Sequence, residues 1–121
     1  MKRILIVDDS PTMLMSMEGV LKRNGYAVET ATSAKQAISK APNFKPDLMI
    51  TDLNMPEMNG IELIKELKRT PAMRFKPMLM LTTESQQAKR DEAKRAGATG
   101  WLVKPVQPDE LTGVVKKVLP A

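Results

Sequence analysis

The sequence ILIVDDSPTM (residues 4–13) runs four apolar residues directly into two adjacent carboxylates. An unbroken apolar run is typical of a strand buried on both faces of a sheet. Ser10 then predicts an N-cap, and Pro11 predicts the first residue of a helix. The charges of Asp8 and Asp9 repel each other, so this arrangement needs water or a cation at the end of the strand.

Strand-like apolar runs and helical periodicity alternate five times along the chain. The expected strands are residues 3–7, 26–30, 47–51, 78–82 and 100–104. Helices are expected after each strand, over segments that include Leu14, Ala37, Ile64, Gln87 and Leu111. Five such units in 121 residues predict an α/β fold, a doubly wound parallel sheet with helices on both faces.

Polar residues stand where these strands end. They are Asp8, Asp9, Asp52, Thr82, Thr83 and Lys104. Right-handed crossovers bring the carboxyl ends of parallel strands to one edge of the sheet, which is where such sheets bind ligands. If the first and third strands are neighbours, three carboxylates meet there. We therefore expect the functional site at this edge.

The residue types at this edge favour phosphoryl chemistry. Three carboxylates without histidine or cysteine are hard oxygen ligands, which suit Mg²⁺ or Mn²⁺. A bound cation would also offset the repulsion between the adjacent aspartates. Lys104 adds a positive charge and Thr82 a hydroxyl donor, a combination that can receive phosphoryl oxygens. An aspartate can itself carry the phosphoryl group, and we predict this role for Asp52.

Each of these residues also has an ordinary structural explanation when taken alone. The adjacent aspartates suit the positive end of the following helix, and Asp52 suits a turn. The two threonines favour strands, and Lys104 suits a sheet edge. The prediction of a site therefore depends on all of them meeting at one place.

Composition excludes several classes of protein. The chain has no cysteine and no histidine, which excludes disulfides, zinc enzymes and Ser-His-Asp hydrolases. No apolar run approaches the roughly 20 residues that a membrane span needs. The net charge is +5, but only 3% of residues are aromatic, which disfavours a nucleic-acid stacking surface. We expect a single cytoplasmic domain, monomeric, that binds neither DNA nor a membrane.

Four motifs, VDDS, TDLNMPEMNG, LTTES and GWLVKP, occur in an order and spacing that resembles the receiver domains of two-component response regulators. The resemblance covers residues 1–121 and is strongest to the stand-alone chemotaxis members of the family. It implies a flavodoxin-like fold with strand order 2-1-3-4-5 and five helices.

The resemblance also implies a role for each matching residue. Asp52 would accept a phosphoryl group from a histidine kinase. Asp8, Asp9, Asp52 and the backbone carbonyl of Asn54 would hold Mg²⁺. Thr82 would move to the phosphoryl group, Lys104 would pair with it, and the bond from Lys104 to Pro105 would be cis.

Three further positions match residues that shape the signal in this family. Trp101 stands where a tyrosine or phenylalanine commonly moves with the hydroxyl as a switch. Asn54 and Glu84 stand where receivers set the lifetime of the acyl phosphate, and their types match fast-cycling chemotaxis regulators. We therefore expect a short-lived signal.

The expected output is a change in the face formed by the fourth helix, fifth strand and fifth helix. Because the sequence stops soon after the fifth helix, we expect this face to bind a separate protein, a flagellar motor switch component. The main alternative is a relay that passes the group to a histidine phosphotransfer protein or regulates another kinase. A receiver that binds its partner without phosphorylation is also considered.

Two other classes fit the sequence less well. An Mg²⁺-dependent phosphohydrolase of the haloacid dehalogenase type would form an aspartyl intermediate, but it needs a second aspartate at position 54, where this chain has asparagine. A flavodoxin needs a glycine- and hydroxyl-rich phosphate loop after the first strand, and DDSPTM contains no glycine.

Overall fold

The computed structural model describes residues 1–83 and 87–119. Within them, five parallel strands form one sheet in the order β2-β1-β3-β4-β5. The strands are β1 (Arg3–Val7), β2 (Ala27–Ala31), β3 (Leu48–Asp52), β4 (Met78–Thr82) and β5 (Gly100–Val103). The helices are α1 (Pro11–Arg23), α2 (Ala34–Phe44), α3 (Gly60–Lys68), α4 (Gln87–Ala96) and α5 (Pro108–Val118). The predicted flavodoxin-like fold and strand order are confirmed.

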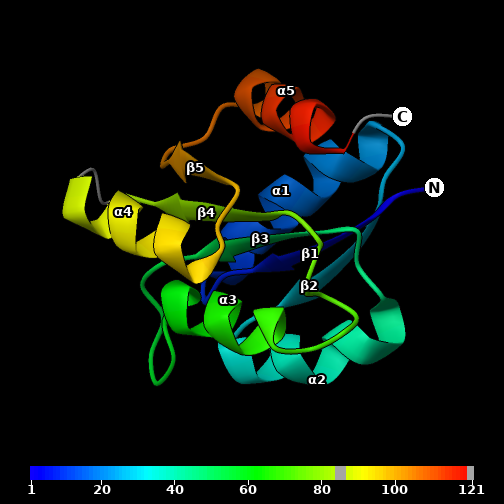
Figure 1. Ribbon diagram of the computed structural model, residues 1–121. Helices are drawn as coiled ribbons and strands as arrows, with labels where there is room; N and C mark the ends of the chain where they lie inside the picture. Colours follow the sequence, from blue (N-terminus) through cyan, green and yellow to red (C-terminus); the bar gives the residue numbers. More distant parts are fainter. Residues whose placement is uncertain (84–86, 120–121) are drawn as a thin grey trace.

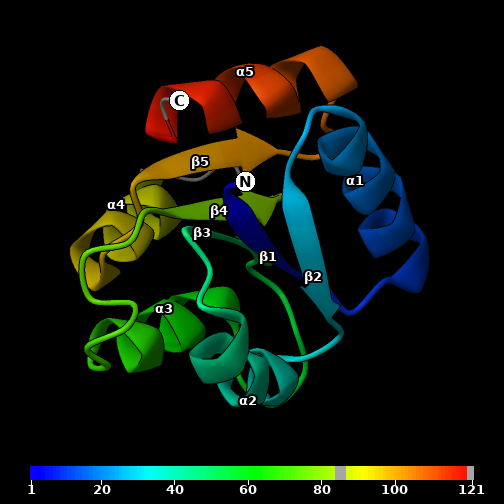
Figure 2. The ribbon, with the colours of Figure 1, turned by 90° about the vertical axis from the view of Figure 1, so that its right-hand side faces the viewer.

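Helices cover both faces of the sheet. Helices α1 and α5 lie on one face, and α2, α3 and α4 lie on the other (Figures 1 and 2). The sheet therefore has one hydrophobic core on each face, and alternate residues of β1 point into them. Ile4 and Ile6 pack toward α1 and α5, whereas Leu5 and Val7 pack toward α2 and α3. All four are buried, as expected for a strand covered on both sides.

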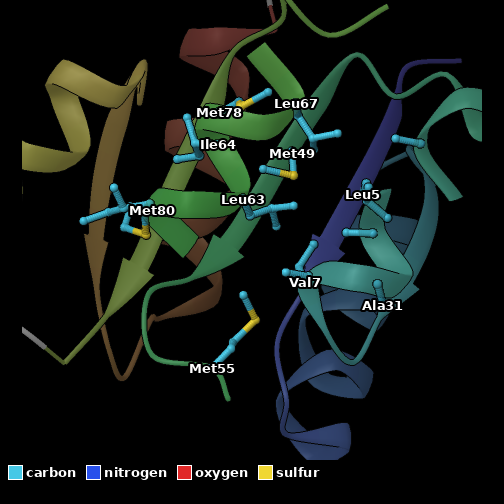
Figure 3. Close-up of a cluster of buried hydrophobic side chains, with 14 of the residues drawn as sticks. Leu5, Val7, Ala31, Met49, Met55, Leu63, Ile64, Leu67, Met78 and Met80 are labelled. Atoms are coloured by element: carbon cyan, nitrogen blue, oxygen red, sulfur yellow. The ribbon is translucent and has the colours of Figure 1, made fainter. Parts of the chain in front are cut away.

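The core on the α2–α3 side is rich in methionine. Figure 3 shows Met49, Met78 and Met80 from the sheet among leucine and isoleucine side chains of α3. Methionine has an unbranched, flexible side chain that fills irregular spaces between a sheet and its helices. This packing holds β3 and β4 in place beneath the carboxyl edge of the sheet.

Three strands differ by one residue from the prediction: β2 and β3 each lie one residue further along the chain, and β5 ends at Val103, one residue before Lys104. β2 runs to Ala31, whose carbonyl accepts a hydrogen bond from the Asp8 backbone N–H at 3.1 Å. β3 includes Asp52, which pairs in register with Leu81 of β4. In both cases a neighbouring strand supplies the partner, and this partner is not visible in the local sequence. The consequence is that Asp52 belongs to the rigid sheet.

Helix α1 begins where the sequence predicts. The Ser10 side chain accepts a hydrogen bond from the Met13 backbone N–H at 3.3 Å, and Pro11 is the first helical residue. Asn24 caps the other end, and Gly25 follows with φ of 90°, a backbone conformation that favours glycine. No helix within the described residues is long and apolar enough to cross a bilayer.

Candidate functional site

Three carboxylates meet at the carboxyl edge of the sheet. β1 and β3 are adjacent, with Val7 opposite Thr51, so the residues that come next, Asp8 and Asp52, stand side by side. Carboxylate oxygens of Asp8, Asp9 and Asp52 lie within 4.8 Å of one another. Asp8 and Asp52 are buried, whereas Asp9 is exposed. The predicted convergence of these side chains is confirmed.

One ammonium group serves the two buried carboxylates. Lys104 Nζ lies 3.1 Å from Asp8 Oδ2 and 3.2 Å from Asp52 Oδ1. The Lys104 backbone N–H donates to the Thr82 carbonyl oxygen at 2.8 Å, which ties the lysine to the end of β4. Three carboxylates and one ammonium leave a surplus of two negative charges at this edge.

The pKa of the Asp52 carboxyl and the pKa of the Lys104 amine are both raised, for different reasons. Burial raises the pKa of the Asp52 carboxyl, and the nearby charge of Asp8 raises it further. Burial alone would lower the pKa of the Lys104 amine, but contact with Asp8 and Asp52 outweighs burial and raises it. A simple ion pair would lower the pKa of its acid. Here Lys104 has two partners, whereas each carboxylate has only a share of one cation.

The donor set at this edge fits a divalent cation. The Asp8 backbone is held by Ala31, and its Oδ1 accepts a hydrogen bond from the Ser10 backbone N–H at 2.9 Å. Among the described residues only Lys104 contacts Asp8 Oδ2. Oxygen ligands from three carboxylates, with an excess of negative charge, are the chemistry that Mg²⁺ and Mn²⁺ prefer.

The predicted hydroxyl and amide residues lie at or just after the carboxyl ends of β3 and β4. Thr82 ends β4 and is buried, and Thr83 is exposed. Asn54 follows Asp52 by two residues and is exposed. Glu84 lies outside the described residues. The Lys104–Pro105 peptide bond is cis, as the resemblance implied.

Trp101 lies on β5 beneath an arginine of α4. Its ring is half-buried against the α2–α3–α4 side of the core. The Arg90 guanidinium carbon lies 5.5 Å from the ring centroid, a cation–π distance. Both residues line a cavity of about 200 Å³ together with Lys94 and Gly100. Sequence reasoning missed Arg90, since the helical pattern of α4 does not reveal which position lies over Trp101.

Gly60 is a second residue that sequence reasoning missed. It is buried at the start of α3, and its backbone N–H donates to the Leu53 carbonyl oxygen at 2.9 Å. A Cβ atom placed here would overlap the Asp52 carbonyl oxygen and approach Met80 Sδ to 2.9 Å. The start of α3 therefore presses directly on the backbone that carries the Asp52 carboxylate.

Comparison with known proteins agrees with this geometry. The family model described as response regulator receiver domain matches residues 4–116. This chain belongs to that family. The receiver is 39% identical to the chemotaxis protein CheY of Thermotoga maritima, covering 97% of each chain, and 34% identical to protein PilH of Pseudomonas aeruginosa, covering 98% of each. Its structure resembles that of the chemotaxis protein CheY4 of Vibrio cholerae, with a TM-score of 0.96, 42% identity and coverage of 98% and 99%.

We expect Asp52→Asn to stabilise the metal-free receiver at pH 7 by roughly 1 kcal/mol, or about 4 °C in melting temperature. The amide removes a buried charge, while Lys104 remains paired with Asp8. Because the folded pKa of Asp52 lies above the ordinary value of 3.8, ionisation costs stability only as the pH rises above that value. The gain should therefore shrink toward pH 4.

Thermal unfolding with a chelator present, measured from pH 4 to pH 7, checks this expectation. Asp9→Asn serves as the control, since Asp9 is exposed and its charge is solvated. An equal gain from Asp52→Asn at both ends of the pH range would contradict the electrostatic explanation.

We expect Gly60→Ala to lower the free energy of unfolding by about 2 kcal/mol, because an added methyl group must displace backbone rather than a flexible side chain. Gly113→Ala is the matched control. Gly113 lies inside α5 with nothing within 4 Å of an added Cβ, so this change should stabilise the helix by up to about 1 kcal/mol. Urea unfolding of both variants measures the difference, and equal effects would show that the contact at Asp52 is unimportant.

Proposed function

We propose that this receiver domain accepts a phosphoryl group on Asp52 from the phosphohistidine of a histidine kinase. An Asp52 carboxylate oxygen attacks phosphorus, the phosphorus–nitrogen bond breaks, and the histidine leaves as the neutral imidazole after taking up a proton. The observation that carries this proposal is the surplus of two negative charges around a nearly buried aspartate, which is 5% exposed. Without a cation this surplus would repel an anionic phosphoryl donor.

The same surplus supports a requirement for Mg²⁺. Asp8, Asp9, Asp52 and the Asn54 backbone carbonyl would hold the ion. When bound, it supplies positive charge that lets an anionic phosphoryl donor approach the carboxylate. Asp8 is fixed by two backbone hydrogen bonds. One ligand position is therefore rigid before any ion arrives.

We propose that Lys104 and Thr82 respond to the new phosphoryl charge. Phosphorylation adds up to about two negative charges. Lys104 Nζ already lies 3.2 Å from the accepting oxygen and can pair with a phosphoryl oxygen. Thr82 ends the neighbouring strand, from which its hydroxyl can donate to the same group. Thr82 and Lys104 therefore connect Asp52 to the edge of the sheet that β5 forms.

The proposed output is a change in the α4–β5–α5 face. Trp101 lies on β5 three residues before Lys104, and its ring contacts Arg90 of α4. A shift of the β4 end and Lys104 would therefore reach α4 through this aromatic contact. Gln107, the N-cap of α5, follows Lys104 by three residues in the chain.

We further propose that the partner of this face is a flagellar motor switch protein in a chemotaxis pathway. The full-length similarity to chemotaxis CheY proteins supports this role. A short phosphoryl lifetime, set by Asn54 and Glu84, would suit rapid control of a motor. The receiver would then act as a cytoplasmic, monomeric phosphoacceptor whose only chemistry is its own phosphorylation and dephosphorylation.

Trp101 provides the test, because it is the only tryptophan in the chain. We expect Mg²⁺ with beryllofluoride or acetyl phosphate to change its fluorescence, and Asp52→Asn to abolish the phosphate-dependent part. Mass spectrometry should find a labile adduct of about 80 Da after acetyl phosphate treatment of the wild type only. Asp47→Asn, which changes a carboxylate at the opposite end of β3, should behave as wild type.

An adduct or fluorescence response of equal size in Asp52→Asn would remove Asp52 from the mechanism. The partner is tested separately with an isolated peptide of a flagellar switch protein. We expect beryllofluoride to increase its affinity for the receiver about tenfold, or about 1.4 kcal/mol. No increase, together with phosphoryl transfer to a histidine phosphotransfer protein, would favour the relay instead.

A further inference from the structure

A basic cleft lies at the amino end of the strands, opposite the aspartate cluster. It has a volume of about 460 Å³ and is formed by the start of β1, the segment between α2 and β3, and the segment between α3 and β4. Figure 2 looks onto this end of the molecule, with the N-terminus toward the viewer. The charged side chains that line it are Arg3, Lys45, Asp47 and Lys76.

Asp47, the single carboxylate that lines the cleft, already has partners for both of its oxygens. Asp47 Oδ2 accepts a hydrogen bond from the Arg3 backbone N–H at 2.9 Å, and Oδ1 lies 3.5 Å from Lys76 Nζ. The Arg3 and Lys45 side chains form no ion pair with any residue of the described segments. Lys45 is exposed and follows α2 in a left-handed conformation. The cleft therefore presents two cations without a carboxylate partner.

An exposed aromatic residue directly precedes Lys76, one of the residues that line the cleft. Phe75 is 88% exposed and lies between Arg74 and Lys76, the latter of which lines the cleft. Among the described residues it is the only aromatic side chain that is strongly exposed. A large exposed apolar group beside unpaired charge is typical of an interaction surface.

Lys68 holds the segment that carries Phe75 in place. Lys68 Nζ donates to the Arg74 carbonyl oxygen at 3.2 Å and to the Lys76 carbonyl oxygen at 2.7 Å. The Lys68 stem also packs against the Gly97 backbone, where an added Cβ would lie 3.0 Å from Lys68 Cε. Phe75 is therefore presented to solvent on a braced segment, which limits the ordering entropy that a partner would have to overcome.

We propose that Arg3, Lys45, Arg74, Phe75 and Lys76 form a second docking surface, which binds an acidic segment of a protein partner. Carboxylates of that segment would pair with Arg3 and Lys45 in the cleft, and an apolar side chain would cover Phe75. The charges are complementary, and Asp47 is no obstacle because its oxygens face Arg3 and Lys76. A single aromatic offers no continuous stacking surface for bases, which favours a peptide over a nucleic acid.

The location of this surface gives it a distinct property. It lies at the opposite end of the sheet from Asp52, and it shares no residue with the α4–β5–α5 face. Binding at the basic cleft should therefore be independent of phosphorylation, and it could hold a partner while the other face is switched. The inference does not depend on phosphoryl transfer to Asp52.

The experiment uses the full chain and a short fluorescein-labelled peptide of aspartate, glutamate and leucine residues. The test variant combines Lys45→Asn, Arg74→Gln and Phe75→Ser, with asparagine chosen because it tolerates the left-handed conformation. The control variant combines Lys35→Gln, Lys117→Gln and Met15→Ser, which removes two exposed charges and one exposed apolar side chain elsewhere.

We expect the test variant to bind the peptide about tenfold more weakly at low salt, and the control variant to lose less than about twofold. Beryllofluoride with Mg²⁺ should leave the affinity unchanged. Amide chemical-shift changes in the wild type should concentrate at residues 2, 3, 45, 47 and 74–76. Melting temperatures of both variants confirm that each is folded.

Three outcomes would overturn the proposal. Equal loss in the test and control variants would show that only net charge attracts the peptide. Tighter, variant-sensitive binding of an oligouridylate or of phosphatidylglycerol vesicles would assign the surface to nucleic acid or to lipid. Loss of peptide binding on beryllofluoride addition would show that the two ends of the sheet are not independent.

Discussion

Two buried carboxylates that share one ammonium group are the interaction on which the site depends. Lys104 lies within 3.2 Å of oxygens from both Asp8 and Asp52. Neither aspartate is fully compensated, since burial and mutual repulsion raise the pKa of Asp52 in spite of the lysine. A site in this condition gains from any added positive charge. This condition supports the phosphoryl transfer to Asp52 that we propose.

The parallel sheet makes that arrangement possible. Each strand ends at the same edge, so residues that are 44 positions apart in the chain, Asp8 and Asp52, come within ion-pair reach of one lysine. The surrounding packing restricts how that edge can move. Gly60 presses on the Asp52 carbonyl, and Trp101 lies between the core and Arg90. A change in charge at Asp52 can therefore affect the rest of the domain through only a small number of rigid neighbours.

The two ends of the sheet differ in charge. The carboxyl edge concentrates acid, although the chain as a whole carries a net charge of +5. The amino end gathers basic side chains around the single carboxylate Asp47. Because exposed charges separated by more than about 10 Å are largely screened, the two ends can attract different partners without strong interference. If both proposals hold, one small domain binds a constant partner at one end and a switched partner at the other.

Much of this protein was predictable from local sequence patterns. Apolar runs located all five strands to within one residue at each end. Ser10 and Pro11 located the start of α1. These features depend on side-chain burial and on backbone preferences, which act within a few residues. The carboxylates and Lys104 were also predictable, because a parallel sheet sends every strand end to one edge.

Other features follow only from the tertiary structure. The sequence by itself determined the alternation of strands and helices and the residue types at the strand ends. It did not show that Arg90 lies over Trp101, that Gly60 touches the Asp52 backbone, or that Lys45 and Lys76 line one cleft. Those relations depend on how far helices rotate and where loops cross the surface, which is decided by packing between distant segments.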